Sequence, residues 1–98
     1  MSYTVRITTN GDHSIMRPEM DLDRPFSLGA SKTGAGAAAS VQLVAEVAGV
    51  KTNLDPALSI TNASPKAWPN DYTNTGRRLV TVSGLNGTDD VLTVEVGQ

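Results

Sequence analysis

The chain has 98 residues, of which 8 are basic and 10 acidic, giving a formal net charge of −2. This length suffices for one modest hydrophobic core, so we predict a single domain over residues 1–98. The few basic residues are spread along the chain, so we expect no basic surface of the kind that nucleic-acid binding requires. There is no cysteine for a disulfide or a thiolate metal site. No apolar run is long enough to cross a membrane.

The first predicted strand lies at the N-terminus. Tyr3, Val5 and Ile7 alternate with polar residues, and Asn10-Gly11-Asp12 follows as a turn signal. This segment lacks the basic start and apolar stretch of a signal peptide, so we expect none.

Two less regular segments come next. Residues 13–17 and 20–28 form shorter pieces, with apolar residues at even spacing in the second, and Pro18 and Pro25 interrupt them, which predicts edge strands or bridging segments. Residues 29–40 (GASKTGAGAAAS) are small and predict a flexible arm, or a loop packed closely against another backbone.

Residues 41–50 (VQLVAEVAGV) fit two structures. A strand would place Val41 and Leu43 on one face, whereas a helix would continue the preceding alanines and extend over about 37–48. Four valines in ten residues favour the strand.

The next stretch combines a short strand with a long loop. Asn53 and Asp55-Pro56 are turn formers, and residues 57–61 (ALSIT) alternate as a strand. Residues 62–76 (NASPKAWPNDYTNTG) carry two prolines, three asparagines and a glycine, so we predict the longest loop there.

The strongest local signal lies at the C-terminal end. Two β-branched runs separated by Asn86 and Gly87 predict a β-hairpin over 78–96, with Asp89 and Asp90 keeping its end soluble. We prefer the register that gathers the aliphatic side chains on one face. These side chains are Val80, Val82, Leu92, Val94 and Val96.

Together these signals predict the fold class. About seven short strands between turn signals are typical of an all-β fold, a small antiparallel β-sandwich of immunoglobulin-like architecture. The C-terminal hairpin would supply the last two strands. An α+β domain with a helix at about 37–48, or a partly open barrel, is the alternative.

The sequence offers no catalytic constellation. His13 is the only histidine, no serine lies in a G-x-S-x-G or S-x-x-K motif, and Gly34-Ala35-Gly36 lacks the third glycine and following lysine of phosphate-binding loops. We therefore expect no enzyme, no catalytic residue and no cofactor.

The acidic residues Glu19, Asp21 and Asp23 are candidates for calcium. Alternating carboxylates in an extended segment point the same way and can form an oxygen-rich site. The D-x-[DN]-x-[DN]-G loop is missing, however, and the other interpretation is a solvated strand face. We expect no metal site.

The long loop contains the strongest recognition signal. Trp68 and Tyr72 lie among prolines and are either rigid anchors for a protein partner or, in the case of Trp68, a lid over one end of the core. Arg77 can pair with the acids of a partner or with Glu95. The interface candidates are Trp68, Tyr72, Arg77 and Tyr3.

A short cysteine-free chain rich in Thr, Val, Ala, Gly and Asn, beginning MSYTVRITTNGD and ending VTVSGLNGTDDVLTVEV, resembles the small β-sandwich structural proteins of bacteriophage particles, such as capsid decoration or cement subunits. The resemblance implies a non-enzymatic subunit that repeats in the virion as a homo-oligomer and binds a capsid or other assembly protein. The alternative is a monomeric carbohydrate- or calcium-binding β-sandwich module in the cytoplasm.

Overall fold

The computed structural model describes residues 2–21, 23–34, 36, 38–62, 64–72, 77–86 and 89–98. Residue 22 and parts of the predicted loops (35, 37, 63, 73–76 and 87–88) lie outside these ranges. The strands are β1 (Ser2–Ile7), β2 (Gly11–Ser14), β3 (Ser27–Thr33), β4 (Ala39–Val47), β5 (Val50–Ile60), β6 (Lys66–Ala67), β7 (Arg77–Ser83) and β8 (Val91–Gly97). In the described part of the chain, no helix is suited to crossing a membrane.

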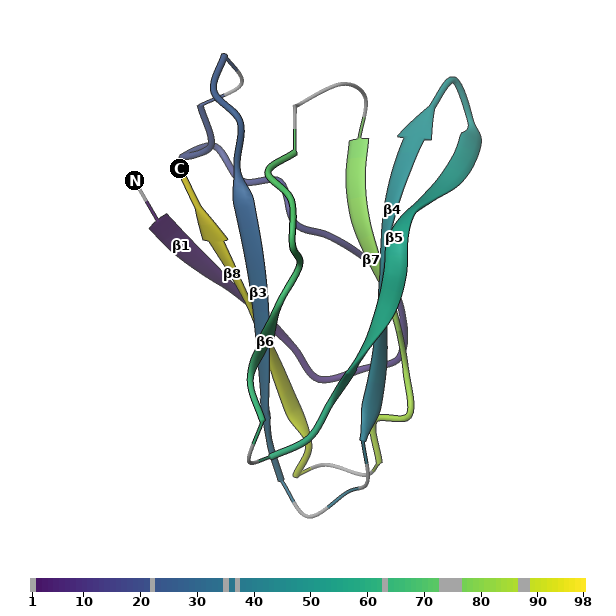
Figure 1. Cartoon of the computed structure of the whole chain (residues 1–98). Coiled ribbons are helices and arrows are strands. Elements are labelled where there is room, and N and C mark those ends of the chain that lie inside the picture. Colours follow the sequence, from purple (N-terminus) through teal and green to yellow (C-terminus); the bar gives the residue numbers. More distant parts are fainter. Residues whose placement is uncertain are drawn as a thin grey trace.

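The strands form two four-stranded antiparallel sheets that pack face to face (Figure 1). One sheet has the order β1-β8-β3-β6 and the other β2-β7-β4-β5. The predicted all-β antiparallel sandwich is confirmed. The alternative helix at about 37–48 is wrong, because β4 occupies Ala39–Val47. Four valines in the segment favour the extended chain, whose alternation directs Val41 and Leu43 into the core between the sheets.

The strand order follows from one long antiparallel ribbon. β1 pairs with β8, β2 with β7, β3 with β6 and β4 with β5, so the two halves of the chain run side by side in opposite directions. Rolling this ribbon adds the pairs β3·β8 and β4·β7. An eight-stranded double sheet wound in this way is a jelly roll.

The predicted hairpin over 78–96 is wrong. β7 lies between β2 and β4 in one sheet, and β8 lies between β1 and β3 in the other, so the two strands do not pair. The Asn- and Gly-bearing segment between them crosses from sheet to sheet. The five aliphatic side chains are nevertheless buried as predicted, since all are at most 2 % exposed, but they come from two facing sheets and not from one hairpin face. They are Val80, Val82, Leu92, Val94 and Val96.

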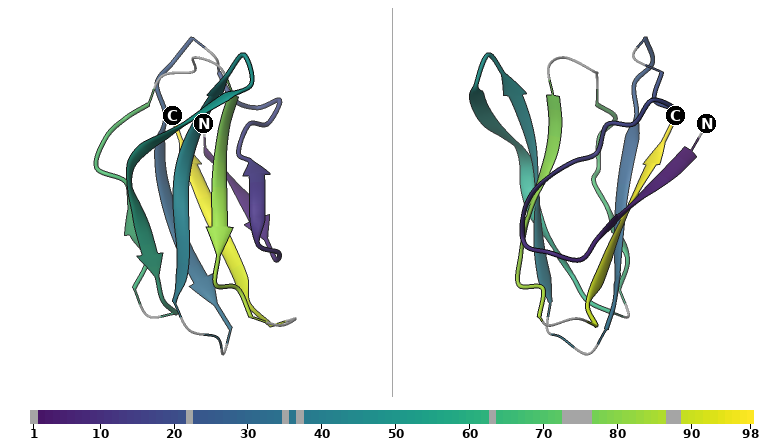
Figure 2. Two further views of the ribbon diagram at one scale, coloured as in Figure 1. Left: turned by 90° about the vertical axis from the view of Figure 1, so that its right-hand side faces the viewer. Right: turned by 180° about the vertical axis from the view of Figure 1, so that it is seen from behind.

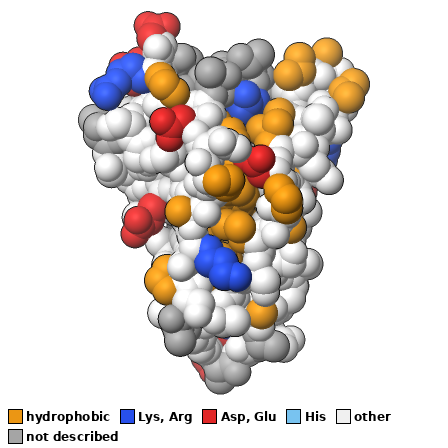
Figure 3. Space-filling model, in the orientation of Figure 1, with side chains coloured by type: hydrophobic (Ala, Val, Ile, Leu, Met, Phe, Trp, Pro, Cys, Tyr) orange, Lys and Arg blue, Asp and Glu red, His pale blue; other side chains and the backbone are white. Residues whose placement is uncertain are grey.

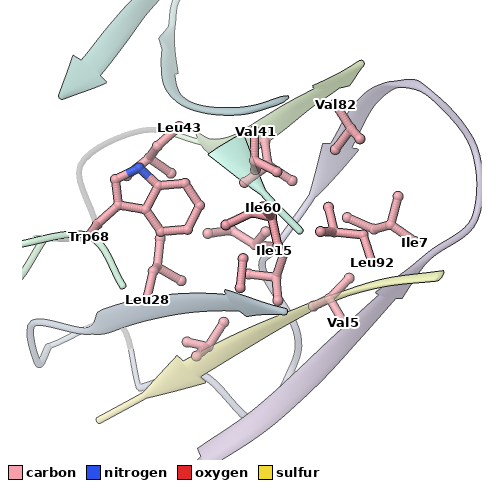
Figure 4. Packing of buried hydrophobic residues seen from close by; sticks show 14 of the residues in the cluster. Val5, Ile7, Ile15, Leu28, Val41, Leu43, Ile60, Trp68, Val82 and Leu92 are labelled. Carbon is pink, nitrogen blue, oxygen red and sulfur yellow. The ribbon is translucent and has the colours of Figure 1, made fainter. Parts of the chain in front are cut away.

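The core lies between the inner faces of the sheets. Figure 4 shows side chains of both sheets facing each other, with Val41 and Val82 on one side and Val5 and Leu92 on the other. Alternation of apolar and polar residues along the strands produces this arrangement. The cluster consists of Val5, Ile7, Ile15, Met20, Phe26, Leu28, Ala30, Ala39, Val41, Leu43, Ile60, Trp68, Tyr72, Val80, Val82, Leu85, Leu92, Val94 and Val96.

Three predicted segments can be compared with the structure. Residues 15–21 and 23–25 form turns, bends and irregular backbone between β2 and β3, which is the bridging segment of the two predicted alternatives, because the prolines remove ladder donors. The small-residue segment 29–40 is mostly strand, with β3 extending to Thr33 and β4 starting at Ala39. The predicted turn at Asp55-Pro56 lies inside β5, as an irregularity in its pairing with β4.

The connections are sorted to the two ends of the sandwich. Figures 1 and 2 show β1–β2, β3–β4, β5–β6 and β7–β8 joined at one end, which we call the loop end. The opposite end carries the β4–β5 hairpin and both chain termini, and we call it the hairpin end. A jelly roll sorts its connections in this way because each strand reverses direction relative to the one before.

Candidate functional site

The long-loop aromatics predicted as interface anchors are part of the core. Trp68 is 4 % exposed, and its indole lies between Leu28 and Leu43 (Figure 4). Tyr72 packs on Phe26 with ring centroids 5.9 Å apart, and the backbones of these two residues pair. Trp68 therefore occupies the lid position.

The other two interface candidates are more accessible. The hydroxyl of Tyr3 donates to the carbonyl of Ile15 at 2.6 Å and attaches the 15–25 segment to β1. The Nη1 atom of Arg77 lies 3.0 Å from the Oε1 atom of Glu46 on the neighbouring strand β4. Arg77 therefore pairs with Glu46 and not with Glu95, the partner that the hairpin prediction offered. The structure separates Tyr3 and Arg77 into different sheets.

The acidic residues proposed for calcium are exposed and lie in a turn region. The backbone N–H of Asp23 donates to the Asp21 carboxylate at 3.0 Å, and the side chain of Gln98 bonds both backbone groups of Asp21. Within the described residues, no three metal-ligating side chains come together. The role of this segment in the structure is to tie the β2–β3 connection to the end of β8.

The only histidine is also engaged locally. The Nε2 atom of His13 lies 2.8 Å from the carbonyl oxygen of Thr9, while the neighbouring Asp12 carboxylate accepts hydrogen bonds from Lys51 and Thr81. The described contacts therefore give Asp12 a role in holding strands together rather than in orienting the His13 ring.

Asp12 takes part in an exposed ion pair on the outer face of the β2-β7-β4-β5 sheet. The Nζ atom of Lys51 on β5 lies 2.6 Å from its carboxylate on β2, so the pair joins the two edge strands. The hydrogen bonds from Lys51 and Thr81 lower the pKa of Asp12. Val44 and Leu79 face outward on the strands between them and are only 4 % exposed.

A β-bulge holds β5 against the long loop. Between the pairs Val41↔Leu58 and Leu43↔Leu54, the register shifts, so that β5 carries extra residues opposite Gln42. The Gln42 side-chain amide donates to the carbonyls of Leu43 on its own strand and of Leu54 and Asp55 on β5. Asp55, in the bulge, has a φ of 58°.

The Asp55 carboxylate binds the long loop directly. It accepts hydrogen bonds from the Tyr72 hydroxyl and from the side-chain amide of Asn70. Burial, followed by the hydrogen bond to Asp55, raises the pKa of the Tyr72 hydroxyl. Since Tyr72 pairs with Phe26 beside β3, this contact connects the edges of the two sheets.

The loop end contains a buried ion pair between Lys32 and Asp90. The Lys32 Nζ atom is 3.3 Å from Asp90 Oδ1, and both side chains are inaccessible to solvent. The carboxylate also accepts hydrogen bonds from the backbone N–H groups of Gly36 at 3.0 Å and Asn86 at 2.8 Å. These two N–H groups and Lys32 lower the pKa of Asp90 against the opposing effect of burial.

This ion pair and its hydrogen bonds connect three of the four loops, and a separate pair of hydrogen bonds attaches the fourth. Lys32 also donates to the side chain of Asn62 in the β5–β6 connection, and Asn10 in the β1–β2 connection exchanges two hydrogen bonds with the backbone of Leu85. The prediction that Asp90 keeps a hairpin end soluble is wrong, because Asp90 is 1 % exposed. The nearby G-x-G motif was the sequence signal for this site, since Gly34 and Gly36 pack directly on Asp90.

The β4–β5 hairpin ends in exposed apolar side chains. Val47 is 52 % and Val50 is 66 % exposed, and within the described part of the chain these are the only exposed large hydrophobic residues. We call residues 47–50 the apolar tip. Figure 3 shows hydrophobic side chains gathered at the upper right, where this hairpin ends in Figure 1. The sequence did not predict this tip, because the turn formers of this region lie at Asn53 and Asp55-Pro56.

A shallow hollow lies on the outer face of the other sheet. It measures about 470 Å³ and is lined by parts of β1, β3, β6 and β8, including Gly29, Ala67, Glu95 and Gly97. A second depression of about 280 Å³ shares Gly29, Ala67 and Glu95 with it. We call the combined surface the outer hollow.

Comparisons with known proteins find no family model, curated protein or solved structure that matches this chain. The described surface therefore has to be interpreted from its own geometry. Its distinctive features are the apolar tip, the outer hollow and the buried ion pair that holds the loop end together.

Proposed function

We propose that this chain is a non-enzymatic structural or interaction module, a repeated subunit that decorates or stabilises a phage particle. The jelly roll supports this proposal because the architecture recurs in viral capsid proteins. Architecture alone does not determine function, since lectins and other proteins share this fold. The proposal therefore depends on features of the surface.

The observation that carries it is the apolar tip. Val47 and Val50 project from a hairpin at one end of a well-packed double sheet, where they contribute little to the core. Exposed apolar side chains at one projecting site are typical of a protein contact. The partners we propose are a capsid or other assembly protein and further copies of the chain, within a virion.

Co-sedimentation with particles tests this proposal. The purified chain, mixed with particles of its source virus stripped of this subunit, should bind them saturably and raise the temperature at which they release their genome. The double variant Val47→Ser/Val50→Ser should bind at least about tenfold more weakly, because each valine is an apolar contact. Thr52→Ser on the same hairpin is the control. Particles that neither bind the chain nor contain it would contradict the proposal.

A monomeric carbohydrate-binding module is the second candidate, and the outer hollow favours it. The hollow is lined by Ser2, Thr4, Ser27 and Glu95, which offer hydrogen-bonding groups to sugar hydroxyls. Its two aromatic lining residues are poorly placed for stacking, however, since the Trp68 side chain is in the core and the Tyr3 hydroxyl is bonded to Ile15. Screening the chain against immobilised glycans separates the two functions: specific binding that Glu95→Gln abolishes would favour the module.

A further inference from the structure

The apolar tip has a conformation that its sequence disfavours. The two residues between Val47 and Val50 both have positive φ, 52° at Ala48 and 80° at Gly49. A two-residue connection of this kind prefers Asn, Asp or Gly at its first position. Alanine there raises the energy of the turn, since a Cβ atom is strained in the left-handed region. The chain thus has an apolar residue where a polar one would fit the turn better.

Such a departure from local preference is typical of a functional surface. The apolar tip has both this unfavourable turn residue and two exposed apolar side chains, because Val47 and Val50 are each more than half exposed. Its three side chains, those of Val47, Ala48 and Val50, are short, so the tip presents a narrow and slightly convex apolar surface. A shallow receptor with a floor of small residues suits this shape better than a deep groove.

The outer hollow is a receptor of that shape. In the sheet register, Thr4, Glu95, Gly29 and Ala67 form one row across β1, β8, β3 and β6. The floor is low because Gly29 has no side chain. A Cβ atom built on Gly29 would lie in ordinary contact with the Lys66 carbonyl oxygen at 3.5 Å and the Ala67 Cβ atom at 4.0 Å, so the position has room for a methyl group without a clash.

The charges around the two surfaces are complementary. Glu95 borders the hollow, is exposed, and forms no ion pair within the described residues. At the base of the tip, the side chains of Lys51 and Arg77 are 49 % and 63 % exposed, and each pairs with an acid of its own sheet. Surface pairs of this kind contribute little, so either cation can also contact a carboxylate from another molecule.

We propose that the apolar tip of one copy of this chain inserts into the outer hollow of a second copy. This inference rests on the proposed function and names a second copy as a partner of the tip. The two surfaces lie on different sheets, so the contact is heterologous, and each copy keeps one free tip or one free hollow. Repetition of the contact produces a closed ring or an open row, which suits a subunit that repeats over a shell.

Sedimentation velocity with two kinds of variant tests the contact. Val47→Ser/Val50→Ser removes the apolar tip, and Gly29→Leu fills the hollow. We expect the wild type to form larger species as its concentration rises, and each variant to stay at the monomer mass, with association weakened at least about tenfold. Gly29→Ala should give a smaller effect, and Thr52→Ser none. Circular dichroism and urea unfolding confirm that each variant is folded.

Mixing the two variants gives the decisive result. The tip variant retains a hollow and the hollow variant retains a tip, so an equimolar mixture should form a 1:1 complex and nothing larger. A symmetric contact between two tips would let the hollow variant associate with itself and would leave the tip variant monomeric in this mixture, and that result would overturn the inference. A wild type that remains monomeric at millimolar concentration would overturn it as well.

The same variants separate this inference from the proposed function. If the wild type remains monomeric but binds particles through its tip, a shell protein occupies the tip, and the inference fails while the proposed function stands. If the wild type self-associates as expected but particles neither contain nor bind it, the contact between copies stands and the role in the particle fails.

Discussion

At the scale of single residues, the loop end depends on one carboxylate. Asp90 is held by two backbone N–H groups and by Lys32, and its neighbours Gly34 and Gly36 leave no room for side chains. A buried charge is stable only when it is paired and hydrogen-bonded, and here each bond comes from a different loop or strand. The network therefore fixes how the loops meet.

Gly36→Ala tests how tightly this carboxylate is packed. The new Cβ atom would overlap the Asp90 carboxylate, which cannot move without losing its hydrogen bonds. We expect the free energy of unfolding to fall by about 1–3 kcal/mol, measured by urea denaturation. Gly29→Ala, which meets no close atom, is the matched control and should change it by less than about 0.5 kcal/mol. Equal effects of the two substitutions would contradict the packing argument.

Asp90 also predicts how stability depends on pH. Its pKa is lowered in the folded chain, so the stability it contributes is present above the unfolded pKa of about 3.9 and is lost as pH falls through the lower folded value. The wild type should therefore lose stability on acidification below about pH 4. Asp90→Asn should be less stable at pH 7 and lose less over that range.

Urea denaturation of both proteins between neutral pH and about pH 2 measures this difference. Asp12→Asn is the control, because the pKa of Asp12 is also lowered, but its ion pair is exposed to solvent. If the Asp90→Asn and wild-type curves ran parallel through the acid range, Asp90 would not be the group responsible.

At the scale of elements, the β4–β5 hairpin combines two irregular features. The bulge around Asp55 binds the long loop through Tyr72 and Asn70, and the apolar tip projects at the hairpin end. A bulge increases the local twist of a strand, so β5 bends toward the other sheet at this point. The same hairpin thus helps to close the sandwich and presents its most apolar exposed surface.

Ala48→Asn should stabilise the protein. Asparagine tolerates positive φ better than alanine and is preferred in a two-residue hairpin turn. We expect the free energy of unfolding to rise by about 0.5–1 kcal/mol. Gly49→Ala, which places a Cβ atom at a φ of 80°, should lower it by about 1 kcal/mol. Thermal and urea unfolding of both variants measure these changes, and a destabilising Ala48→Asn would mean that the turn is not strained at this position.

At the scale of the whole molecule, stability depends on contacts between distant parts of the chain. β1 pairs with β8 from Ser2↔Gly97 to Ile7↔Leu92, and β2 pairs with β7 in the other sheet. Only β4 and β5 are joined by a short hairpin. Most pairings therefore require the closure of long loops before they contribute free energy, which slows folding.

Refolding should take milliseconds to seconds rather than microseconds. Trp68 is the only tryptophan and is buried in the core, so its fluorescence in stopped-flow dilution from urea reports formation of the sandwich. Substitutions in β4 or β5 should affect the folding rate more than substitutions of similar cost in β1, because the hairpin closes the shortest loop. A refolding phase of microseconds would contradict this topology.

Much of the fold could be predicted from the sequence, because strand formation depends on local alternation. The N-terminal strand, the strand after Ala39 and the inward face of Val80 and Val82 all follow from side-chain period. The candidate site was harder to predict. Apolar residues 47–50 resemble any strand interior, and their exposure depends on how far the hairpin extends beyond the sandwich.

The sequence by itself determined that this chain is an all-β antiparallel sandwich, and which side chains of its strands face inward. The tertiary structure alone decided that β7 and β8 separate into different sheets, that Asp90 is buried against Lys32, and that Trp68 covers the core. The physical reason is the separation along the sequence over which each effect acts. Alternation acts between neighbouring residues, whereas sheet membership, burial of charge and exposure of the tip depend on contacts between residues far apart in the chain.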